Sequence, residues 1–212
     1  MSQHRQATDS CKTVSRPPLN DEEKYATVKN IQRWKVLSET DISPSKWFPL
    51  YQQTIRIHGG KIIDDYFISR LGDVAMVIPK MKNGLIAMVR QYKHGAGDIT
   101  IEFPAGRIDQ DEKPQNAARR EVREETGIQC GDLVSLGNMF PSPTKDSARL
   151  HGFFSSNSEV LHEVGFDESE DIETVFFSEM EIEEMIREGD INCSDTIGLW
   201  MKYKLMQSVV VP

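Results

Sequence analysis

The chain has 212 residues, which is enough for one domain, or for one domain with a small appendage. Hydrophobic residues make up 38% of it and charged residues 27%, so a core can form and wholesale disorder is not expected. The formal net charge of −8 argues against a nucleic-acid partner, which requires a basic surface. A small phosphorylated ligand stays compatible with this charge, because a bound divalent cation reverses the local field.

The cysteines and the apolar runs of the sequence indicate the cellular compartment of the protein. Cys11, Cys130 and Cys193 form no CxxC pair, so the sequence indicates neither a zinc site nor a disulfide framework. No apolar run approaches the ~18 residues of a transmembrane helix. The polar N-terminus lacks the apolar region of a signal peptide. We therefore expect a cytoplasmic protein without a membrane partner.

The first third of the chain divides into a polar tail and a β-rich segment. Residues 1–30 are polar and predict a disordered tail. Short β-like runs fill residues 31–70, and the turn HGGK at 58–61 separates two of them, as a hairpin requires. We therefore expect an N-terminal β segment at 31–70 ahead of a main domain at 71–212.

The main domain mixes strands and helices. The periodicity predicts a helix over 114–126, with Pro114 in its first turn and Gly127 as its stop. Two further helices are expected over 178–189 and 194–207. Strands are expected over 74–80, 84–92, 133–140, 148–154 and 172–178. Strands on both sides of helices indicate an α/β or α+β layered fold.

The helix at 114–126 separates its charges by sign. On a helical wheel of about 100° per residue, Ala118 and Val122 form a narrow apolar contact. The charged positions fall into one basic group and one acidic group: Arg119, Arg120 and Arg123, then Glu121, Glu124 and Glu125. Surface salt bridging favours a glutamate four residues ahead of a lysine or arginine. The one opposite pair at that spacing, Arg120–Glu124, has the poorer order.

An acidic stripe repels itself unless a positive charge lies against it. Hard cations such as Mg²⁺ take carboxylate oxygens, keep several waters and often bridge to substrate phosphates. Glu121 and Glu125 are one turn apart and can hold one such ion or a pair. From the helix alone, a solvated charged surface is the competing interpretation.

The residues around the helix fit a longer pattern. The spacing G-x5-E-x7-R-E-U-x-E-E-x-G-U, with U a bulky aliphatic residue, is matched at every position by Gly106, Glu112, Arg120, Glu121, Val122, Glu124, Glu125, Gly127 and Ile128. This resembles the Nudix box, the signature of the Nudix hydrolases. The resemblance implies an α/β fold, an α/β/α sandwich with a mixed sheet, here preceded by the small N-terminal β segment. It also implies hydrolysis of nucleoside diphosphates linked to another moiety.

The same resemblance assigns roles by position. The metal ligands for Mg²⁺, with Mn²⁺ as an alternative, would be Glu121 and Glu125, with Glu124 assisting and the carbonyl of Ala105 completing the site. Arg120 would orient the carboxylates together with Glu112, for which a salt bridge that closes the loop and metal ligation are both open. The chemistry is consistent, because the metal neutralises the pyrophosphate and holds an acidified water in line.

Three stretches outside the box resemble the ADP-ribose and ADP-sugar pyrophosphatase branch. They are RQYKHG with IEFPAG ahead of the box, FPSPT at 140–144, and DESEDIETVFFSEMEIEEMIREGDI at 167–191, which resembles the branch's late acidic loop, strand and helix. Pro143 falls at the branch's marker proline. Glu168 matches a loop glutamate assigned as general base, and Glu170 matches a further metal ligand. A solvated acidic loop is the alternative for both glutamates.

The N-terminal β segment resembles strands that ADP-sugar pyrophosphatases exchange between subunits, which implies a homodimer. Trp47 matches an adenine-stacking tryptophan, and Tyr66 could stack against the same base. Arg70 shares a strand face with Tyr66 by the period of two and could reach the ribose or a phosphate. Core packing or a dimer contact is the alternative for Trp47 and Tyr66, and packing is expected for Trp34.

The sequence thus favours a Mg²⁺-dependent pyrophosphatase that converts ADP-ribose or a related ADP-sugar to AMP and a sugar phosphate. GDP-mannose or another nucleoside-diphosphate derivative is the neighbouring alternative, and a nucleotide-sensing module without catalysis is a more distant one. Lys93 replaces the branch's arginine with a point charge. Together with Thr144 and Ala148, it departs from the branch's usual residues and leaves the terminal group of the substrate open.

Overall fold

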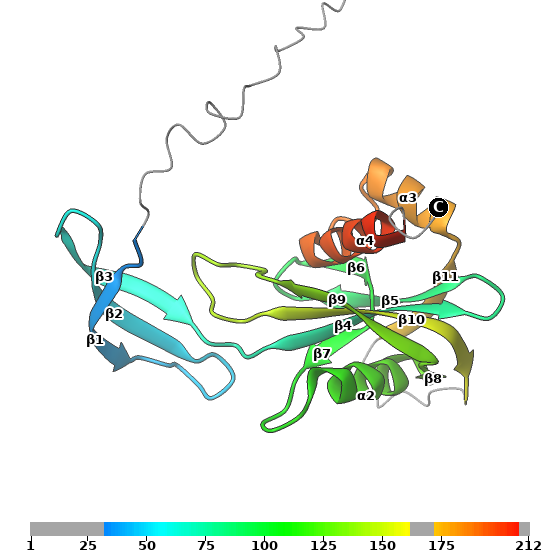
Figure 1. Ribbon diagram of the computed structural model, residues 1–212, viewed down its shortest axis with the longest axis horizontal. Coiled ribbons are helices and arrows are strands. Elements are labelled where there is room, and N and C mark those ends of the chain that lie inside the picture. Colours follow the sequence, from blue (N-terminus) through cyan, green and yellow to red (C-terminus); the bar gives the residue numbers. More distant parts are fainter. Residues whose placement is uncertain (1–31, 162–171, 208–212) are drawn as a thin grey trace, which may run out of the picture.

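The computed structural model of the protein describes residues 32–161 and 172–207 (Figure 1). These residues form a small three-stranded sheet followed by an eight-stranded mixed sheet. Helices lie on both faces of the larger sheet, with α2 on one side and α3 and α4 on the other (Figure 1). The expected α/β/α sandwich with a preceding β segment is confirmed. The predicted tail at 1–30 lies outside the described residues.

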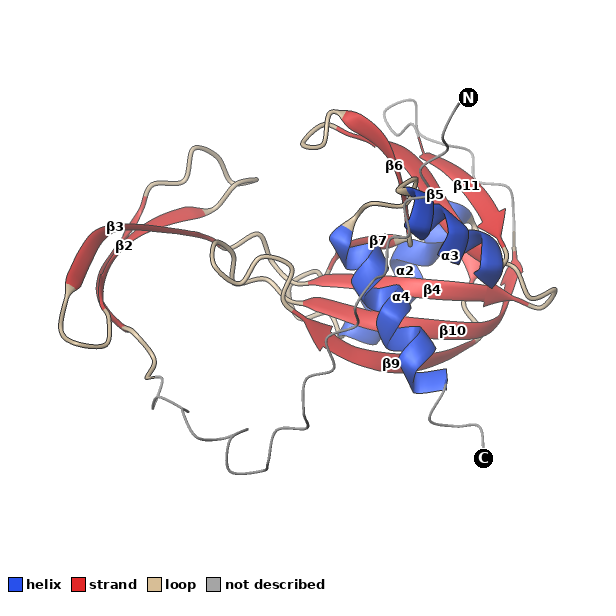
Figure 2. Cartoon of the chain, turned by 90° about the horizontal axis from the view of Figure 1, so that it is seen from above, coloured by secondary structure: helices blue, strands red, loops and turns tan. Residues whose placement is uncertain are grey.

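The small sheet is antiparallel in the order β1-β2-β3, with β1 at Lys35–Asp41, β2 at Leu50–Arg56 and β3 at Ile62–Ser69. The predicted hairpin turn joins β2 to β3, and Gly59 and Gly60 adopt positive φ angles of 91° and 87° there. Such angles suit glycine because it has no Cβ. Viewed from above, β2 and β3 stand clear of the main body (Figure 2).

The larger sheet contains β4 at Val74–Met81, β5 at Ile86–Lys93, β6 at Asp98–Glu102, β7 at Ala105–Arg107, β8 at Ile128–Gln129, β9 at Asp132–Met139, β10 at Leu150–Val160 and β11 at Ile172–Phe177. Its main path is β11-β5-β4-β10-β8, while β6 pairs with β5, β7 with β4 and β9 with β10. Strands β4 and β10 run parallel, whereas the other pairs are antiparallel.

The split between β4 and β5 positions the segment before the helix. The two strands are in register only at Lys80 and Ile86. Further along, β5 pairs with β6 and β4 pairs with β7. The chain between β6 and β7 lies against β4, and the Val77 N–H donates to the Pro104 carbonyl at 3.0 Å. Ala105 and Gly106 are therefore held at a fixed place beside the central strand β4.

Local signals define the helices: α2 at Pro114–Thr126, α3 at Glu179–Glu188 and α4 at Ser194–Gln207. The predicted bounds of α2 are confirmed. Gly127 ends it with a left-handed φ of 67°, and its N–H donates to the Arg123 carbonyl. Ser178 and Glu181 form a capping box at the start of α3. Within the described ranges, no helix has the length and apolarity to cross a membrane.

The core has one cluster on each face of the larger sheet, because alternate residues of β4 point to opposite sides. Ala75 and Val77 face α2, where Ala118 and Val122 are fully buried as the wheel predicted. The second cluster contains larger side chains, including Phe103 stacked on Trp200 of α4. Small residues on the first face let α2 lie close to the sheet.

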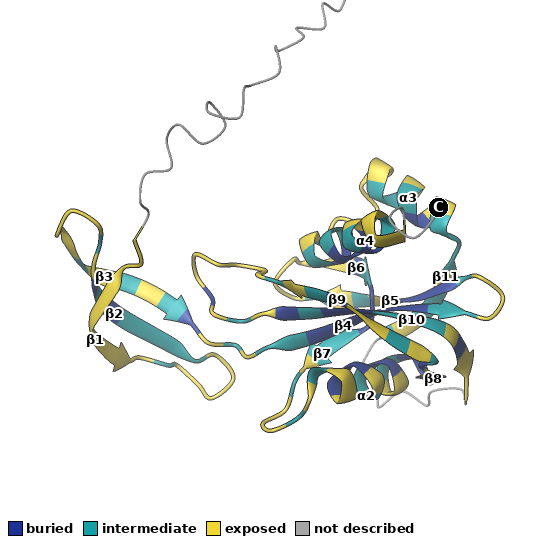
Figure 3. Ribbon diagram, in the orientation of Figure 1, coloured by how far each residue is buried: buried dark blue, intermediate teal, exposed yellow. Residues whose placement is uncertain are grey.

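The loop between β9 and β10 attaches the small sheet to the main body. The Ser69 N–H donates to the Lys145 carbonyl at 2.7 Å, and the Ser147 N–H donates back to the Ser69 carbonyl at 3.2 Å. The Ser69 hydroxyl also donates to the carboxylate of Asp146. Within the small sheet, β1 is exposed along its whole length, whereas β2 is mostly half-buried or buried (Figure 3). The chain division at residue 70 itself stays a prediction.

Candidate active site

Arg120 ties the acidic stripe of α2 to the preceding loop. Its Nη1 donates to Glu121 Oε1 at 2.6 Å and to Glu124 Oε2 at 3.1 Å. Its Nε and Nη2 donate to the two oxygens of Glu112 at 3.2 and 2.8 Å, and Nη2 also reaches the Arg107 carbonyl. These hydrogen bonds lower the pKa of Glu112 and raise the pKa of Arg120. The planar fork of the guanidinium thus closes the loop from Arg107 to Glu112 onto the helix.

Glu121 lies against Gly106 at the edge of the sheet. Its side chain is only 13% exposed. A Cβ placed on Gly106 would come within 2.1 Å of the Glu121 Cδ, so this approach requires a glycine. Burial raises the pKa of Glu121, while the hydrogen bond from Arg120 opposes that change. A negative charge at this buried place is therefore stabilised by a cation beside it.

Glu125 brings the next turn of the helix to the same segment. Its Oε2 accepts a hydrogen bond from the Ala105 N–H at 3.0 Å. Glu124, on the same side of the helix, has a side chain that is 52% exposed. Glu121 and Glu125 thus both lie against the Ala105–Gly106 segment, whereas Glu124 is joined to Glu121 through Arg120.

The chemistry of these donors fits Mg²⁺. They are carboxylate and carbonyl oxygens, which hard cations prefer, and no soft ligand stands among them. In residues 32–161 and 172–207, no three His, Cys, Asp or Glu side chains are already arranged around one point. Arg120 supplies the positive charge next to Glu121 and Glu124 instead. Glu121, Glu125 and the Ala105 carbonyl, with Glu124 assisting, stay the predicted ligands of the metal. Glu168 and Glu170 lie outside the described residues and stay predictions.

The aromatic residues predicted to bind the base lie on the small sheet. Trp47 is 69% exposed, and Lys46 Nζ lies 4.7 Å from its ring centroid. Tyr66 donates through its hydroxyl to the Thr144 carbonyl at 2.6 Å. Its ring meets Trp34 edge-on at 5.8 Å, and Trp34, which was expected to pack, is itself 52% exposed. Tyr66 is therefore fixed at the junction, and Trp34 is its aromatic neighbour.

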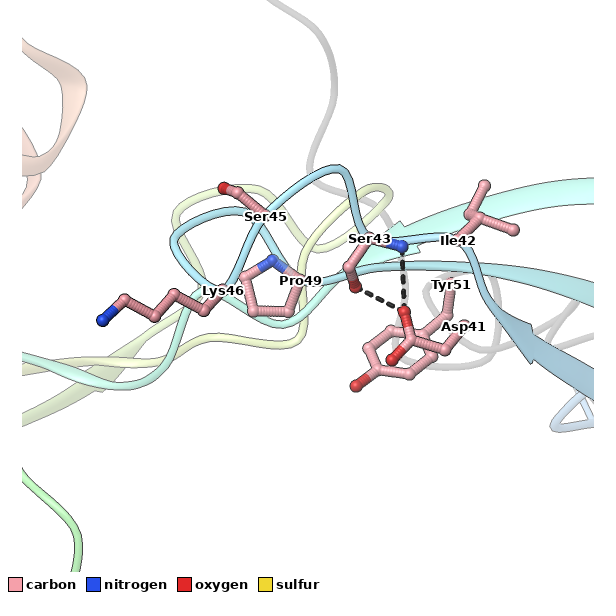
Figure 4. A pocket seen from close by; sticks show the side chains of 7 residues that line it. All are labelled: Asp41, Ile42, Ser43, Ser45, Lys46, Pro49 and Tyr51. Carbon is pink, nitrogen blue, oxygen red and sulfur yellow. Dashed lines mark hydrogen bonds between the residues drawn. The ribbon is translucent and has the colours of Figure 1, made fainter.

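Arg70 is held within the small sheet. Its Nη2 lies 2.6 Å from Glu39 Oε2, and its guanidinium lies 4.2 Å from the ring centroid of Tyr51. Tyr51 also lines a cavity of about 590 Å³ with Asp41, Ile42, Ser43, Ser45, Lys46 and Pro49 (Figure 4). Pro143 is exposed in the turn before the junction. Within one chain, the proposed base-binding residues thus belong to the small sheet and its loops, whereas the acidic stripe belongs to helix α2 on the larger sheet.

A half-buried carboxylate near Lys93, that of Glu102, was missed by sequence reasoning. Glu102 Oε1 accepts hydrogen bonds from the Thr100 hydroxyl at 2.6 Å and the Cys193 thiol at 3.2 Å. Glu102 Oε2 lies 4.0 Å from Lys93 Nζ. Glu102 belongs to the stretch IEFPAG that the sequence singled out, but its contact with a residue 91 positions later is a feature of the tertiary structure.

Comparison with known proteins identifies the family of this chain. A mixed sheet between helices, with an acidic helix held against the Ala105–Gly106 segment, defines the class of the Nudix pyrophosphatases. The NUDIX domain model matches residues 70–196, more than half of the chain, and the chain belongs to this family.

Two relatives and one solved structure give the range of similarity. The chain is 29% identical to the ADP-ribose pyrophosphatase of Bacillus subtilis (strain 168) over 142 residues, which are 66% of this chain and 76% of that protein. It is 31% identical to the GDP-mannose pyrophosphatase of Escherichia coli O1:K1 over 127 residues, 56% of this chain and 65% of that protein. A crystal structure of an ADP compounds hydrolase shares the fold, with a TM-score of 0.73 at 19% identity, over 84% of this chain and 96% of that one.

Proposed function

We propose that the protein hydrolyses the pyrophosphate bond of ADP-ribose or a related ADP-sugar, in a Mg²⁺-dependent reaction that yields AMP and a sugar phosphate. The observation that supports this most is the contact of Glu121 and Glu125 with the Ala105–Gly106 segment. It gathers hard oxygen donors on one helix edge. The name of the Bacillus subtilis relative supports the choice of substrate.

Each group of the site has a part in this proposal. When bound, Mg²⁺ or Mn²⁺ would neutralise the pyrophosphate oxygens and lower the pKa of a bound water. Glu121, Glu125 and the Ala105 carbonyl hold the cation, and Glu124 assists. Arg120 keeps the carboxylates in place through its bond to Glu112. Glu168 takes the proton from the attacking water and Glu170 adds a metal ligand. Reactions of this type depend on positioning and charge stabilisation.

Substrate recognition in the proposal comes from Trp47, Tyr66, Arg70, Lys93 and Pro143. Trp47 stacks on the adenine, and Arg70 and Lys93 contact the ribose or the phosphates. Trp47 lies in the loop between β1 and β2, and in this proposal it acts in the site of a second subunit. A base stacked on an exposed indole gains a large apolar contact at little cost in conformational entropy.

A homodimer built through the small sheet is therefore part of the proposal. All seven residues of β1 are exposed. Large apolar side chains on this sheet and its loops are at least 38% exposed, namely Trp34, Val36, Leu37, Ile42, Trp47, Phe48, Ile62 and Phe67. Exposed apolar side chains gathered on one small sheet favour a protein–protein contact there. Cover by a second copy would stabilise this small sheet, because it would bury those apolar side chains.

A substrate panel tests the reaction. The full-length protein is incubated with Mg²⁺ and, separately, ADP-ribose, ADP-glucose, GDP-mannose, diadenosine polyphosphates and NADH, and the products are separated. We expect AMP and ribose phosphate from ADP-ribose, and no turnover after chelation of the metal. Turnover of none of the compounds would overturn the proposed activity.

The same panel separates the alternatives. Preferred hydrolysis of GDP-mannose would favour the reaction named in the Escherichia coli relative. Saturable binding of a nucleotide with no product would favour a sensing module.

Sedimentation of the active protein tests the proposed homodimer, and an active monomer would rule out a site shared between two subunits. Phe67→Asp places a charge in the exposed apolar surface of β3 and is expected to weaken the dimer.

A further inference from the structure

We propose that Glu102 is a positioning residue for Lys93, and that Thr100 and Cys193 hold Glu102 in place for this purpose. The inference rests on the proposed function, in which Lys93 contacts the diphosphate-linked substrate. It assigns these three residues to the positioning of the Lys93 side chain. It also gives a role to Cys193, which lies outside the segment that contains the Nudix box.

The two oxygens of Glu102 have different surroundings. Oε1 accepts from the Thr100 hydroxyl at 2.6 Å and from the Cys193 thiol at 3.2 Å, so its position is fixed from two sides. Oε2 lies on the side of Lys93, 4.0 Å from Nζ. The side chain of Glu102 is 15% exposed, whereas that of Lys93 is 43% exposed. The carboxylate is thus fixed and mostly buried, and the ammonium group has access to solvent.

The separation of 4.0 Å matters for ligand binding. It is longer than a direct hydrogen bond, so the protons of the Lys93 ammonium are not committed to Glu102. The charge attraction still restricts the four-carbon side chain, which otherwise loses entropy when it binds a phosphate. Glu102 therefore draws Lys93 toward the sheet and leaves its hydrogen-bond donors for a substrate oxygen.

The position in the fold connects this support to the reacting centre. Strands β5 and β6 are paired, with Gln91 opposite Thr100 and Val89 opposite Glu102. Glu102 precedes Ala105 by three positions on the segment that contacts Glu125. Cys193 comes from the link between α3 and α4, and β6 lies below α4 in Figure 1. A shift of Glu102 would therefore move both Lys93 and the segment at Ala105 that contacts Glu125.

The competing explanation is that Glu102 and Cys193 only stabilise the start of α4. Cys193 precedes α4, and its carbonyl accepts from the Ile197 N–H. Asp195 follows it, and both burial and the nearby charge of Glu102 raise the pKa of Asp195. Asp195 thus brings a second negative charge close to Glu102. Within the described part of the chain, Lys93 is the one cation recorded within 4.0 Å of Glu102, which favours a paired function for the two.

Steady-state kinetics on the full-length enzyme with Mg²⁺ and the substrate selected by the panel decide between these explanations. Glu102→Gln keeps the acceptor for Thr100 and Cys193 but removes the charge near Lys93. We expect KM to rise about fivefold with kcat changed less than about twofold, the size typical of a partly exposed charge pair. Lys93→Met should raise KM at least as much, and adding Glu102→Gln to it should change KM little further. Lys82→Met, which removes an exposed lysine paired with Glu159, is the matched control and should leave KM unchanged.

Cys193 gives a second test, which does not depend on activity. Burial and the contact with Glu102 raise the pKa of the Cys193 thiol to about 11. Removal of the Glu102 charge should lower this pKa, so Glu102→Gln should speed alkylation of Cys193 by iodoacetamide at pH 9, measured by peptide mass spectrometry.

If Glu102→Gln fails to fold, Cys193→Ser and Cys193→Ala replace it in the kinetic test. Serine keeps a donor to Glu102 and should retain the wild-type KM, while alanine should raise it.

The outcomes separate the two proposals. If no substrate is turned over but Glu102→Gln speeds alkylation, the proposed function has failed and the Glu102–Cys193 contact stands. The positioning role is overturned if Glu102→Gln lowers kcat and thermal stability while KM stays constant. It is also overturned if the KM effects of Glu102→Gln and Lys93→Met multiply in the double variant, because independent residues behave in this way.

Discussion

The contact between Gly106 and Glu121 makes Gly106→Ala the sharpest test of the site. Gly106 does not have a positive φ, so alanine can adopt its backbone conformation without strain. A Cβ there would lie 2.1 Å from Glu121 Cδ and 2.2 Å from Oε2, whereas ordinary contact begins at 3.4 Å. The carboxylate must therefore move by about 1.3 Å, the difference between 3.4 and 2.1 Å. A displacement near 1 Å costs on the order of 10²-fold in rate.

We therefore expect Gly106→Ala to lower kcat/KM about 10²-fold, and to lower the free energy of unfolding by only about 1–3 kcal/mol, as is typical of overpacking. Mg²⁺-dependent hydrolysis and thermal unfolding would be measured side by side. Gly95→Ala is the matched control, because a Cβ on Gly95 has no atom within 4 Å and its φ is not positive. Activity within twofold of wild type for Gly106→Ala would refute the close packing of Glu121 on this segment.

Three further predictions concern single side chains. Glu125→Gln should lower kcat by about 10²–10³-fold with little change in thermal stability, because it weakens a proposed metal ligand on a helix edge; near-normal turnover would contradict this. Arg120→Lys should lower both activity and stability, because one ammonium group cannot replace the fork that joins Glu112 to Glu121, and calorimetry with kinetics would show it. Glu179→Gln should remove a pH-dependent part of stability. Burial alone would raise the pKa of Glu179, but hydrogen bonds from Lys80, Lys204 and Tyr203 lower it from 4.5 to about 2. This stabilisation, about 2 kcal/mol after allowance for solvent, is present above pH 4.5 and is lost as the pH falls toward 2. Denaturant unfolding from pH 6 to pH 3 should therefore show a smaller loss in the variant than in the wild type.

The elements that the sequence located well carry strong local signals. Helix α2 begins at Pro114 and stops before Gly127 as predicted, because proline fits the first turn and glycine accepts the left-handed angle. The short strands β6, β7 and β8 were not predicted. They have five, three and two residues, too few to show a period, and they exist because β5, β4 and β10 offer them hydrogen-bond partners.

The recognition residues show a different limit. The period of two placed Tyr66 and Arg70 on one strand face, but β3 ends at Ser69, and the two side chains contact different partners. Tyr66 binds the Thr144 carbonyl, and Arg70 binds Glu39. Neither partner could be read from the sequence, because the first lies 78 positions away and the second comes from another strand.

The sequence by itself determined the acidic stripe of α2, the loop spacing from Gly106 to Glu112 and hence the family. Those features are local, and they follow from helix geometry and from residues at fixed intervals. Only the tertiary structure decided that Glu121 lies on Gly106, that Arg120 closes the loop through Glu112, and that Glu102 meets Cys193 beside Lys93. The first contact arises because β4 and β5 diverge and let the segment between β6 and β7 lie against the central strand, and the other two join residues from separate parts of the chain, which no local pattern specifies.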